Sequence, residues 1–431
     1  MLTDAKSDAT GQSGVSTLGA PAGDASPGEG APSAPAVTML CWCYYPHAGG
    51  GADRVMQQVA EFLVRRGGQV TVLTKTFNDV PRQEAVNGVA VRRVFTLEIP
   101  RLRFFSYMTS AFFHQLFHRD RCQVLHVNQF YLYVPLAIWL RRRRGMRVVV
   151  EVHGSGLAGD VPRLDRLPLG LGRLVRRAGQ QADAFISLTR QITEELAGVG
   201  IARERIFQIP NGVDCARFAP ATPDQRLALR AQLSLPPDRP IVFFSGRLSA
   251  EKAVDVLLRA WQRLRARCPE ALLVVAGDGP LRADMEALAR ELGLEESVRF
   301  LGWIEQVLPF YQAADLFALS SWSEGMSIAL LEAMACGLAP VVTAIAGNVD
   351  VVAHERNGLL VPSGDAEELA AALARTLNDA SLRAQLAAAA IQTVRADFSL
   401  ERMLKRYTDL YQRLAQSAQG RRPQDKKERR P

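Results

Sequence analysis

Glu324 and Glu332 are separated by seven residues, and both could hydrogen-bond the hydroxyl groups of a ligand. Glu324 stands in the loop after an expected strand, Leu316–Ser320, and Glu332 lies in an apolar segment that predicts a helix over Met326–Cys336. Taken singly, each could have a structural role only, Glu324 as an acid at a helix N-terminus and Glu332 on a solvated face. A carboxylate in so apolar a helix, however, usually has a partner or a ligand.

The start of that predicted helix offers donors for anionic oxygens. The amides of Met326, Ser327 and Ile328 would lack partners within the helix, and a helix N-terminus carries about half a positive charge. Gly325 precedes them and would let the backbone approach a ligand closely. The segment therefore predicts a site for phosphate or sugar oxygens.

Two cations follow another expected strand, Ile241–Ser245. Arg247 can bind a phosphate with two donors, and Lys252 acts as a point charge. A departing nucleoside diphosphate needs such charges, because negative charge develops on its oxygens in the transition state. The alternative is a surface cluster of basic and acidic side chains without a ligand.

The first half of the chain has weaker signals of the same kind. Gly49, Gly50 and Gly51 join the first expected strand to the first helix, where they would let a diphosphate or an acceptor approach, although such turns are common. His153 follows the expected strand Arg147–Val152 and could equally be structural. No role is assigned to the remaining histidines, which are His47, His114, His118, His126 and His354.

Alternating strands and helices must position these loops. The pattern predicts parallel βαβ units in two runs, joined by a Pro-rich stretch at residues 214–240. We therefore expect an α/β protein of two facing, doubly wound Rossmann-like domains, with a ligand cleft at the carboxyl ends of the strands. The expected strands are Val37–Tyr45, Val70–Thr74, Val89–Phe95, Val124–Val127, Arg147–Val152, Phe185–Leu188, Ile241–Ser245, Leu272–Ala276, Val298–Leu301, Leu316–Ser320, Pro340–Val342 and Leu359–Val361.

The length of 431 residues also predicts two domains. We expect one domain over residues 37–215 and a second over residues 216–397. A C-terminal helix at 398–416 and a basic tail at 417–431 would follow, and a disordered segment, 1–36, would precede them.

Composition narrows the partners and the compartment. The formal net charge of +8 suits an anionic partner, whether nucleic acid, an anionic membrane surface or a phosphorylated substrate. No nucleic-acid-binding motif is present, so nucleic acid is not expected. The six cysteines lack zinc spacing, and neither a secretory signal nor an apolar run of about 18–20 residues is visible. We expect a reduced, cytoplasmic protein that could dock on the inner face of a membrane.

Taken together, the motifs resemble those of the large retaining glycosyltransferase family 4, whose members have the two-domain fold called GT-B. The resemblance covers roughly residues 38–415, and the order and spacing of its motifs are far more specific than any one of them. Those motifs are Gly49-Gly50-Gly51, His153-Gly154, Pro210-Asn211-Gly212-Val213-Asp214, Gly246-Arg247-Leu248 with Glu251-Lys252, Gly277-Asp278-Gly279-Pro280, Phe300-Leu301-Gly302, Glu324 with Glu332, and Asn357-Gly358-Leu359-Leu360-Val361-Pro362.

The resemblance implies a role for each site residue. Arg247 and Lys252 would hold the donor diphosphate and stabilise the leaving group, Glu324 would bind hydroxyls of the transferred sugar, and Glu332 the nucleotide ribose. The amides of Gly325, Met326, Ser327 and Ile328 would contact sugar and phosphate. His153, Gly50 and Gly51 would complete the site from the first domain, and Gly302 and Ile304 would lie near the base.

The resemblance also implies transfer of a hexosyl-type sugar to a glycan or lipid-linked acceptor, with retention of configuration. We expect no metal and no other cofactor, because the chain lacks an Asp-x-Asp motif and the two cations can supply the charge. One departure is Ala253, where the family usually has glycine after the lysine. The sequence leaves the donor open between UDP and GDP sugars.

The resemblance implies that residues 37–215 form the acceptor-side domain and residues 216–397 the nucleotide-sugar domain. The acceptor-side domain is the least informative part of the sequence. Aromatic and basic residues mix at 101–105, 112–119 and 141–144, which suits an anionic membrane surface or, equally, a partly buried helix with a solvated basic face. Two other functions remain open. They are a nucleotide-sugar epimerase of the same fold and a non-catalytic, basic binding protein.

Overall fold

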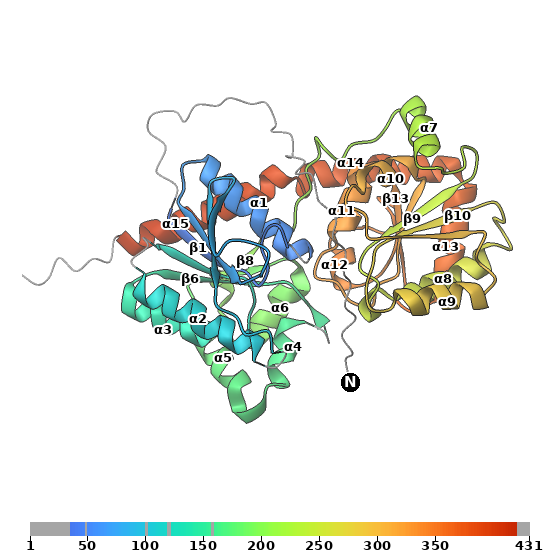
Figure 1. The fold of residues 1–431 in the computed structure, drawn as a ribbon. Coiled ribbons are helices and arrows are strands. Elements are labelled where there is room, and N and C mark those ends of the chain that lie inside the picture. The colour runs from blue at the N-terminus through green and yellow to red at the C-terminus, as the bar shows by residue number, and fades with distance from the viewer. Residues whose placement is uncertain (1–34, 48–49, 100–101, 119–121, 157–158, 420–431) are drawn as a thin grey trace, which may run out of the picture. The chain divides into compact units, whose positions relative to one another are not determined.

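The computed structural model describes residues 35–47, 50–99, 102–118, 122–156 and 159–419 (Figure 1). The expected disordered segment, 1–36, lies outside the described residues except for its last two positions. The expected basic tail, 417–431, likewise lies outside them from residue 420 onward.

The first sheet is built from the strands of the first half of the chain. It has eight strands in the order β3-β4-β2-β1-β5-β6-β7-β8, all parallel except β3, which pairs antiparallel with β4. The bounds are β1 Val37–Leu40, β2 Val70–Lys75, β3 Gln83–Val86, β4 Val89–Val94, β5 Val124–Val127, β6 Arg147–Val152, β7 Ala184–Ser187 and β8 Ile206–Gln208.

The second sheet has six parallel strands in the order β11-β10-β9-β12-β13-β14. Its first strand in the chain, β9, lies in the middle, so the chain winds outward on one side of β9 and then returns to the other. The bounds are β9 Ile241–Ser245, β10 Leu272–Ala276, β11 Val298–Gly302, β12 Leu316–Leu319, β13 Ala339–Thr343 and β14 Leu359–Val361.

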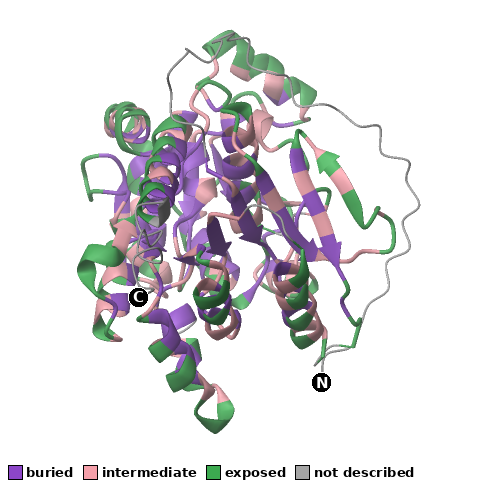
Figure 2. Cartoon of the chain, turned by 90° about the vertical axis from the view of Figure 1, so that its left-hand side faces the viewer, coloured by how far each residue is buried: buried purple, intermediate pink, exposed green. Residues whose placement is uncertain are grey.

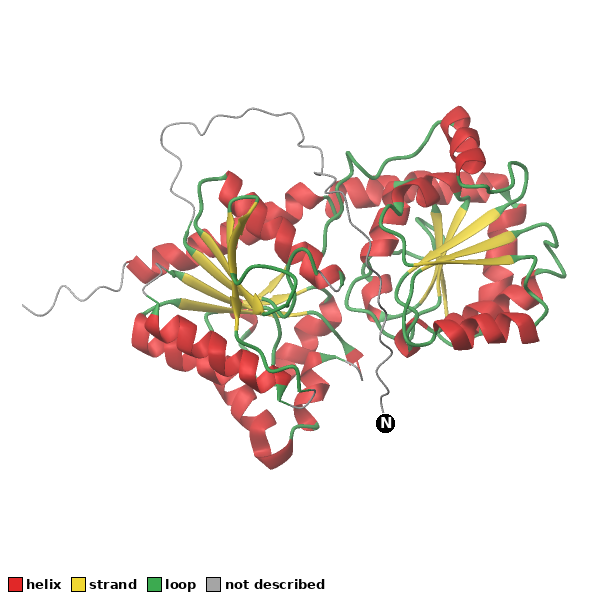
Figure 3. Cartoon of the chain, in the orientation of Figure 1, coloured by secondary structure: helices red, strands yellow, loops and turns green. Residues whose placement is uncertain are grey.

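Helices cover both faces of each sheet (Figure 3). On the first sheet, α1 and α15 lie on one face and α2, α3 and α5 on the other (Figure 1). The bounds are α1 Gly51–Arg65, α2 Arg103–Phe117, α3 Tyr133–Arg144, α4 Asp160–Asp165, α5 Leu171–Gly179, α6 Arg190–Gly198, α7 Pro223–Gln232, α8 Val254–Leu264, α9 Arg282–Glu291, α10 Leu308–Ala313, α11 Ile328–Ala335, α12 Ala346–Val349, α13 Ala366–Asn378, α14 Ala380–Asp397 and α15 Leu400–Gln419.

The central strands are buried on both faces, as parallel strands covered by helices must be. Every residue of β1, β5, β7, β10, β12 and β13 is buried, and Figure 2 shows the buried strands inside a shell of exposed helix surface. This burial explains why continuous apolar runs predicted these strands, although the expected range of β1 ran too far. The expected doubly wound α/β architecture with a C-terminal helix is confirmed.

The last helix returns to the first sheet. Met403, Leu404, Tyr407 and Tyr411 of α15 pack in one apolar cluster with side chains of α1 and of the first sheet. Because α15 follows the whole second sheet in the chain, residues far apart in the sequence form this core.

Three local expectations were wrong. The Pro-rich stretch contains a helix, α7, which begins at a capping box between Thr222 and Gln225. The first strand ends at Leu40 instead of Tyr45. The helix expected at Met326 begins at Ile328 instead, with consequences described below. Within the described residues, no helix combines the length and the apolar character that crossing a membrane requires.

Candidate functional site

The loops after β9 and β12 leave the second sheet side by side. These strands are neighbours in the sheet although two strands separate them in the chain. The loop after β9 carries Arg247 and Lys252, and the loop after β12 carries Glu324. Ligands of open α/β sheets bind at such a reversal of strand order, outside the carboxyl ends of the strands.

Lys252 and Glu324 form an ion pair, from the lysine Nζ to Oε1 of the glutamate. The hydroxyl of Ser321 donates to the same Oε1 over 2.8 Å. The side chains of Lys252 and Glu324 are 16% and 11% exposed, so the pair is largely shielded from water and still reachable. The structure thus places two predicted site residues in direct contact.

The backbones of the two loops are also joined. The amide of Trp322 donates to the carbonyl of Glu251 over 2.8 Å, and the hydroxyl of Ser320 donates to the carbonyl of Lys252 over 3.0 Å. These two bonds hold the loops of Lys252 and Glu324 together independently of the Lys252–Glu324 ion pair.

Arg247 extends from the same loop with an exposed side chain. Its positive charge acts electrostatically on the carboxyl of Glu251. Burial alone would raise the pKa of that carboxyl, but its own amide, the Ser249 hydroxyl, Lys252 and Arg247 lower it. Glu251 is therefore a carboxylate at neutral pH, and Arg247 is the exposed cation that this loop offers to an anionic ligand beside the Lys252–Glu324 pair.

His153, from the first sheet, lies against the glutamate loop. A β-carbon at Gly325 would lie 1.7 Å from the carbonyl oxygen of His153, so only glycine fits there. Ser155 secures the contact, since its hydroxyl donates to the carbonyl of Glu324 over 3.3 Å and its carbonyl accepts from the Ser323 hydroxyl over 3.1 Å. The candidate residues of the two sheets therefore meet at one place.

The side chain of His153 has its own partners. Its Nε2 lies 2.5 Å from Oδ1 of Asn128, and its amide donates to Oδ2 of Asp160 over 3.3 Å. The ring follows β6 directly, and Asn128 follows the neighbouring strand β5, so both stand at the carboxyl edge of the first sheet. Two adjacent strands thus hold the imidazole.

The start of α11 differs from the expectation. Ser327 is the N-cap, with extended backbone, and its hydroxyl accepts from the amide of Leu330 over 3.3 Å. Met326 is buried in the loop, where its carbonyl accepts from the Asn211 side chain over 3.0 Å. The first helical amides are therefore those of Ile328 and the residue after it, because Ser327 competes for the backbone as N-cap residues do.

Glu332 is buried on α11 instead of lying on a solvated face. Its side chain accepts a 3.0 Å hydrogen bond from the hydroxyl of Tyr311, so the expected partner exists. Burial raises the pKa of Glu332 to about 6, although Tyr311, Arg54 and Arg217 act in the opposite direction. The influence of Arg54 places α1 of the first sheet near this carboxylate.

The chain matches two family models. Residues 49–217 match Glycosyltransferase Family 4, and residues 225–393 match Glycosyl transferases group 1. A D-inositol 3-phosphate glycosyltransferase from Xylanimonas cellulosilytica is 30% identical over 372 residues, which cover 79% of this chain and 86% of that protein. The chain belongs to glycosyltransferase family 4. It is therefore a glycosyltransferase of group 1, as its motifs predicted.

Two further proteins are similar to this family 4 glycosyltransferase. A GDP-mannose-dependent monoacylated alpha-(1-6)-phosphatidylinositol monomannoside mannosyltransferase from Corynebacterium glutamicum is 29% identical, covering 64% of this chain and 74% of its own. The structure of sucrose-phosphate synthase from Thermosynechococcus elongatus has a TM-score of 0.77 at 26% identity, covering 89% of this chain and all of that one. The GT-B fold is thereby confirmed.

The remaining predicted residues of this glycosyltransferase lie at the margins of the site. Gly50 is the N-cap of α1, and a β-carbon at Gly51 would lie 2.8 Å from Cδ1 of Ile328, which places the glycine loop against the start of α11. Gly49 lies outside the described residues. Gly302 ends β11 and Ile304 follows it, half-buried, without a hydrogen bond or ion pair to Lys252 or Glu324.

Three residues of the site were missed. Asn128, Asn211 and Tyr311 contact His153, Met326 and Glu332 respectively. Asn128 and Tyr311 lie outside every motif, so their partners could be found only from the fold. Asn211 stands in a motif of the family resemblance and could have been assigned from it.

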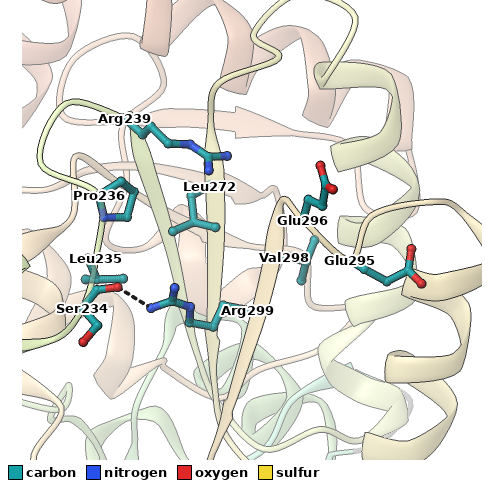
Figure 4. Close-up of a pocket in the computed structure, with 9 residues that line it drawn as sticks. All are labelled: Ser234, Leu235, Pro236, Arg239, Leu272, Glu295, Glu296, Val298 and Arg299. Carbon is teal, nitrogen blue, oxygen red and sulfur yellow. Dashed lines mark hydrogen bonds between the residues drawn. The ribbon is translucent and has the colours of Figure 1, made fainter.

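Two other features carry no role in the site. Within the described residues, no group of three or more His, Cys, Asp or Glu side chains is arranged to hold a metal ion. A groove of about 490 Å³ lies at the amino ends of β10 and β11, opposite the site (Figure 4). In this groove the guanidinium of Arg299 donates a hydrogen bond to the carbonyl of Ser234 over 2.8 Å.

Proposed function

We propose that this glycosyltransferase moves a hexosyl-type sugar from a nucleotide-diphosphate sugar to a glycan or lipid-linked acceptor, with retention and without a metal. The observation that carries the proposal is the Lys252–Glu324 pair at the strand-order reversal, beside Arg247 and against His153. A cation for a leaving diphosphate and a carboxylate for sugar hydroxyls are in direct contact, and Arg247 extends from the same loop as the lysine.

Each side chain has a distinct part in the proposed reaction. Arg247 binds the diphosphate with two donors, and Lys252 neutralises the charge that develops on the diphosphate as it leaves. Oε2 of Glu324 binds the sugar hydroxyls, since Lys252 and Ser321 both contact Oε1. Glu332 binds the ribose, the amides from Gly325 to Ile328 contact sugar and phosphate, and Gly302 and Ile304 lie near the base.

The bond changes follow from retention. The bond between the anomeric carbon and the diphosphate oxygen breaks, and its electron pair leaves with the diphosphate. The acceptor hydroxyl attacks the same face of the sugar, and its proton passes to the departing phosphate oxygen. Arg247 and Lys252 stabilise that oxygen by charge alone, so no metal is needed. His153, Gly50 and Gly51 close the site from the first domain.

We propose a place in cell-surface polysaccharide or glycolipid synthesis, and the name of one relative supports the glycolipid alternative. One acts on a lipid and depends on GDP-mannose, and the other acts on an inositol phosphate, according to their names. Both names describe transfer to an acceptor, which favours a transferase over an epimerase.

A substrate panel tests the proposal. The purified full chain is incubated with UDP- and GDP-hexoses, with and without glycan, inositol phosphate and lipid-linked acceptors, and nucleoside diphosphate release is measured. We expect release that depends on an acceptor, with the sugar recovered on that acceptor in its original anomeric configuration. Acceptor-independent release of a free, epimerised sugar would instead identify an epimerase, and no turnover of any donor would contradict both.

The acceptor side presents a surface suited to an anionic membrane. On α2, Phe113 and Phe117 stack with ring centroids 6.0 Å apart, and they are 52% and 71% exposed. On the neighbouring helix α3, the guanidinium of Arg143 lies 5.0 Å from the ring of Trp139, itself 39% exposed. Exposed rings beside a basic helix end favour the headgroup region of a bilayer. We therefore propose peripheral docking on the cytoplasmic face of the membrane.

Liposome sedimentation tests this docking. We expect the chain to sediment with phosphatidylglycerol vesicles at low salt, to be released at high salt, and to ignore phosphatidylcholine vesicles. The variant Phe113→Ser/Phe117→Ser should lose binding, while Leu227→Ser, which removes a 52% exposed side chain from α7, should keep it. Equal binding by all three proteins would contradict the proposed surface.

A further inference from the structure

A charged network lies buried beneath His153. His126 on β5 pairs in register with Val149 on β6, and Glu151 lies two residues further along the same strand. Because side chains alternate along a strand, His126, Glu151 and His153 point toward the same face of the sheet. That face is the one covered by α1 and α15.

Glu151 is the centre of the network. It is fully buried, and its Oε1 accepts a 2.9 Å hydrogen bond from the hydroxyl of Tyr407 on α15. Its Oε2 lies 3.0 Å from Nε2 of His126, whose Nδ1 in turn lies 2.6 Å from the hydroxyl of Tyr411. Its Oε1 also lies 3.6 Å from Nδ1 of His153. One carboxylate therefore joins two strands, the last helix and the candidate site.

A carboxylate in such a position is costly unless it is paired. Taking an ion out of water costs several kcal/mol, and apolar residues of similar volume would usually stabilise a core at least as well. Burial by itself raises the pKa of Glu151, but His153, His126 and Tyr407 lower it below its usual value. The group is thus a carboxylate at neutral pH, and its partners hold it in the charged form despite its burial.

His153 gains orientation from this carboxylate. Its Nε2 faces Oδ1 of Asn128 at 2.5 Å, and its Nδ1 faces Oε1 of Glu151, so each ring nitrogen has an oxygen on its own side. A separation of 3.6 Å is electrostatic contact and not a hydrogen bond. Such contacts commonly shorten in the substrate complex. A charged partner on the second ring nitrogen fixes the direction of a working imidazole.

We propose that Glu151 is a positioning residue for His153, held in place by Tyr407 and His126, so that the C-terminal helix α15 supports the catalytic site of the first domain. The inference rests on the proposed role of His153 at the donor sugar. It adds that the last helix contributes to turnover as well as to packing.

The competing explanation is that the network only anchors α15 to the sheet. In that case, changes to Glu151 and to His153 would act separately, and their effects would add. If Glu151 acts through His153, removal of the histidine makes the glutamate irrelevant to turnover. A double-mutant cycle on kcat separates the two, because residues that act as a unit are not additive.

The experiment uses the full chain and the donor and acceptor that the substrate panel identifies. Glu151→Gln keeps the volume and the acceptor for Tyr407 but removes the charge. We expect kcat to fall roughly 10- to 100-fold with little change in the donor KM, by analogy with groups that orient the ligands of a catalytic metal. In a His153→Ala background, Glu151→Gln should lower kcat no further.

Asp183→Asn is the matched control. Asp183 is also a largely buried carboxylate of this sheet, 9% exposed, but it pairs with Arg141 and Arg147 and immediately precedes β7, at the amino edge. It should lower the unfolding temperature and leave kcat unchanged.

The outcomes distinguish the two proposals. If His153→Ala keeps normal turnover, the proposed role of His153 is wrong and this inference falls with it. If His153→Ala is impaired but Glu151→Gln acts additively or not at all, only the inference is overturned. Should Glu151→Gln fail to fold, Tyr407→Phe replaces it, and we expect a smaller kcat loss that again vanishes in the His153→Ala background.

Discussion

The ammonium of Lys252 and the carboxylate of Glu324 meet across two loops that leave adjacent strands of the second sheet. Two strands separate β9 from β12 in the chain, although the two are adjacent in the sheet. The pair therefore forms only because the strand order reverses at β9. In the proposed reaction, this contact sets a positive charge for the leaving group beside an acceptor for sugar hydroxyls.

Glu324→Ala should abolish sugar transfer and leave nucleotide binding largely intact. In the proposed reaction the carboxylate binds the sugar, whereas cations and amides that this change does not remove bind the diphosphate. Transfer is measured as acceptor-dependent nucleotide release, and the Kd of the free diphosphate by calorimetry. Glu355→Ala is the control, because Glu355 is an exposed glutamate paired with Arg375 in the same half of the chain. Normal turnover in Glu324→Ala would refute the assignment.

Lys252→Ala should lower kcat about 10²- to 10³-fold, which is the usual effect of removing one group that stabilises developing charge. Donor binding should weaken as well, because the lysine also meets the diphosphate in the ground state. Lys405→Ala on α15 is the matched control, since Lys405 forms an exposed ion pair with Asp409. A variant with wild-type kcat and only a raised KM would show that the lysine acts in binding alone.

Gly325→Ala tests whether the loop must contact His153. A β-carbon there would overlap the carbonyl oxygen of His153, so the loop has to move away from the first sheet. We expect a large loss of kcat together with a lower unfolding temperature. Gly198→Ala is the control, because a β-carbon at Gly198, at the end of α6, meets no atom within 4 Å. An active, fully stable Gly325→Ala protein would mean that the loop is free to shift.

The sequence predicted the buried strands better than the exposed ones. The bounds of β5, β6, β9, β10 and β14 match the expected ranges, because strands buried on both faces are continuous apolar runs between turns. The edge strand β3 escaped notice, since Gln83–Val86 alternates between exposed and half-buried positions and pairs only with β4. Nothing within α15 itself indicates that it packs on the first sheet.

The residues of the site were also predicted only in part from the sequence. Lys252, Glu324 and His153 were found because motifs mark the ends of their strands. Glu151 could have been suspected, as it is a carboxylate within an apolar strand two residues before His153. Its partner Tyr407 could not, because 256 residues separate the two and only the packing of α15 brings them together.

Removal of divalent metal should leave transfer unchanged. In the proposed reaction Arg247 and Lys252 supply the positive charge, and a chelator cannot remove them. Activity is measured after dialysis against EDTA, with and without added Mg²⁺ or Mn²⁺, and a metal-dependent glycosyltransferase run in parallel confirms that the chelation works. Loss of activity in EDTA that either metal restores would contradict a metal-independent reaction.

Glu332→Gln should stabilise the fold while weakening nucleotide binding. Burial raises the pKa of Glu332 to about 6 from an ordinary value of 4.5, so the folded chain binds a proton more tightly than the unfolded chain. The stability contributed by this group is fully present below pH 4.5 and is lost as the pH rises through 6. The loss amounts to about 2 kcal/mol, at about 1.4 kcal/mol per pKa unit.

Because glutamine cannot ionise, the free energy of unfolding of Glu332→Gln should gain on the wild type across this window and reach a plateau above it. Denaturant titrations between pH 4 and pH 8 measure the difference. Tyr311→Phe removes the hydroxyl that lowers the pKa, so it should move the wild-type inflection to higher pH. The nucleotide Kd should rise in Glu332→Gln at pH 8, since a neutral amide is a weaker partner for ribose hydroxyls than a carboxylate. The free energies of unfolding of the wild type and of Glu332→Gln could instead differ by the same amount at every pH, with an unchanged nucleotide Kd. That result would show that Glu332 neither titrates in this range nor binds the ribose.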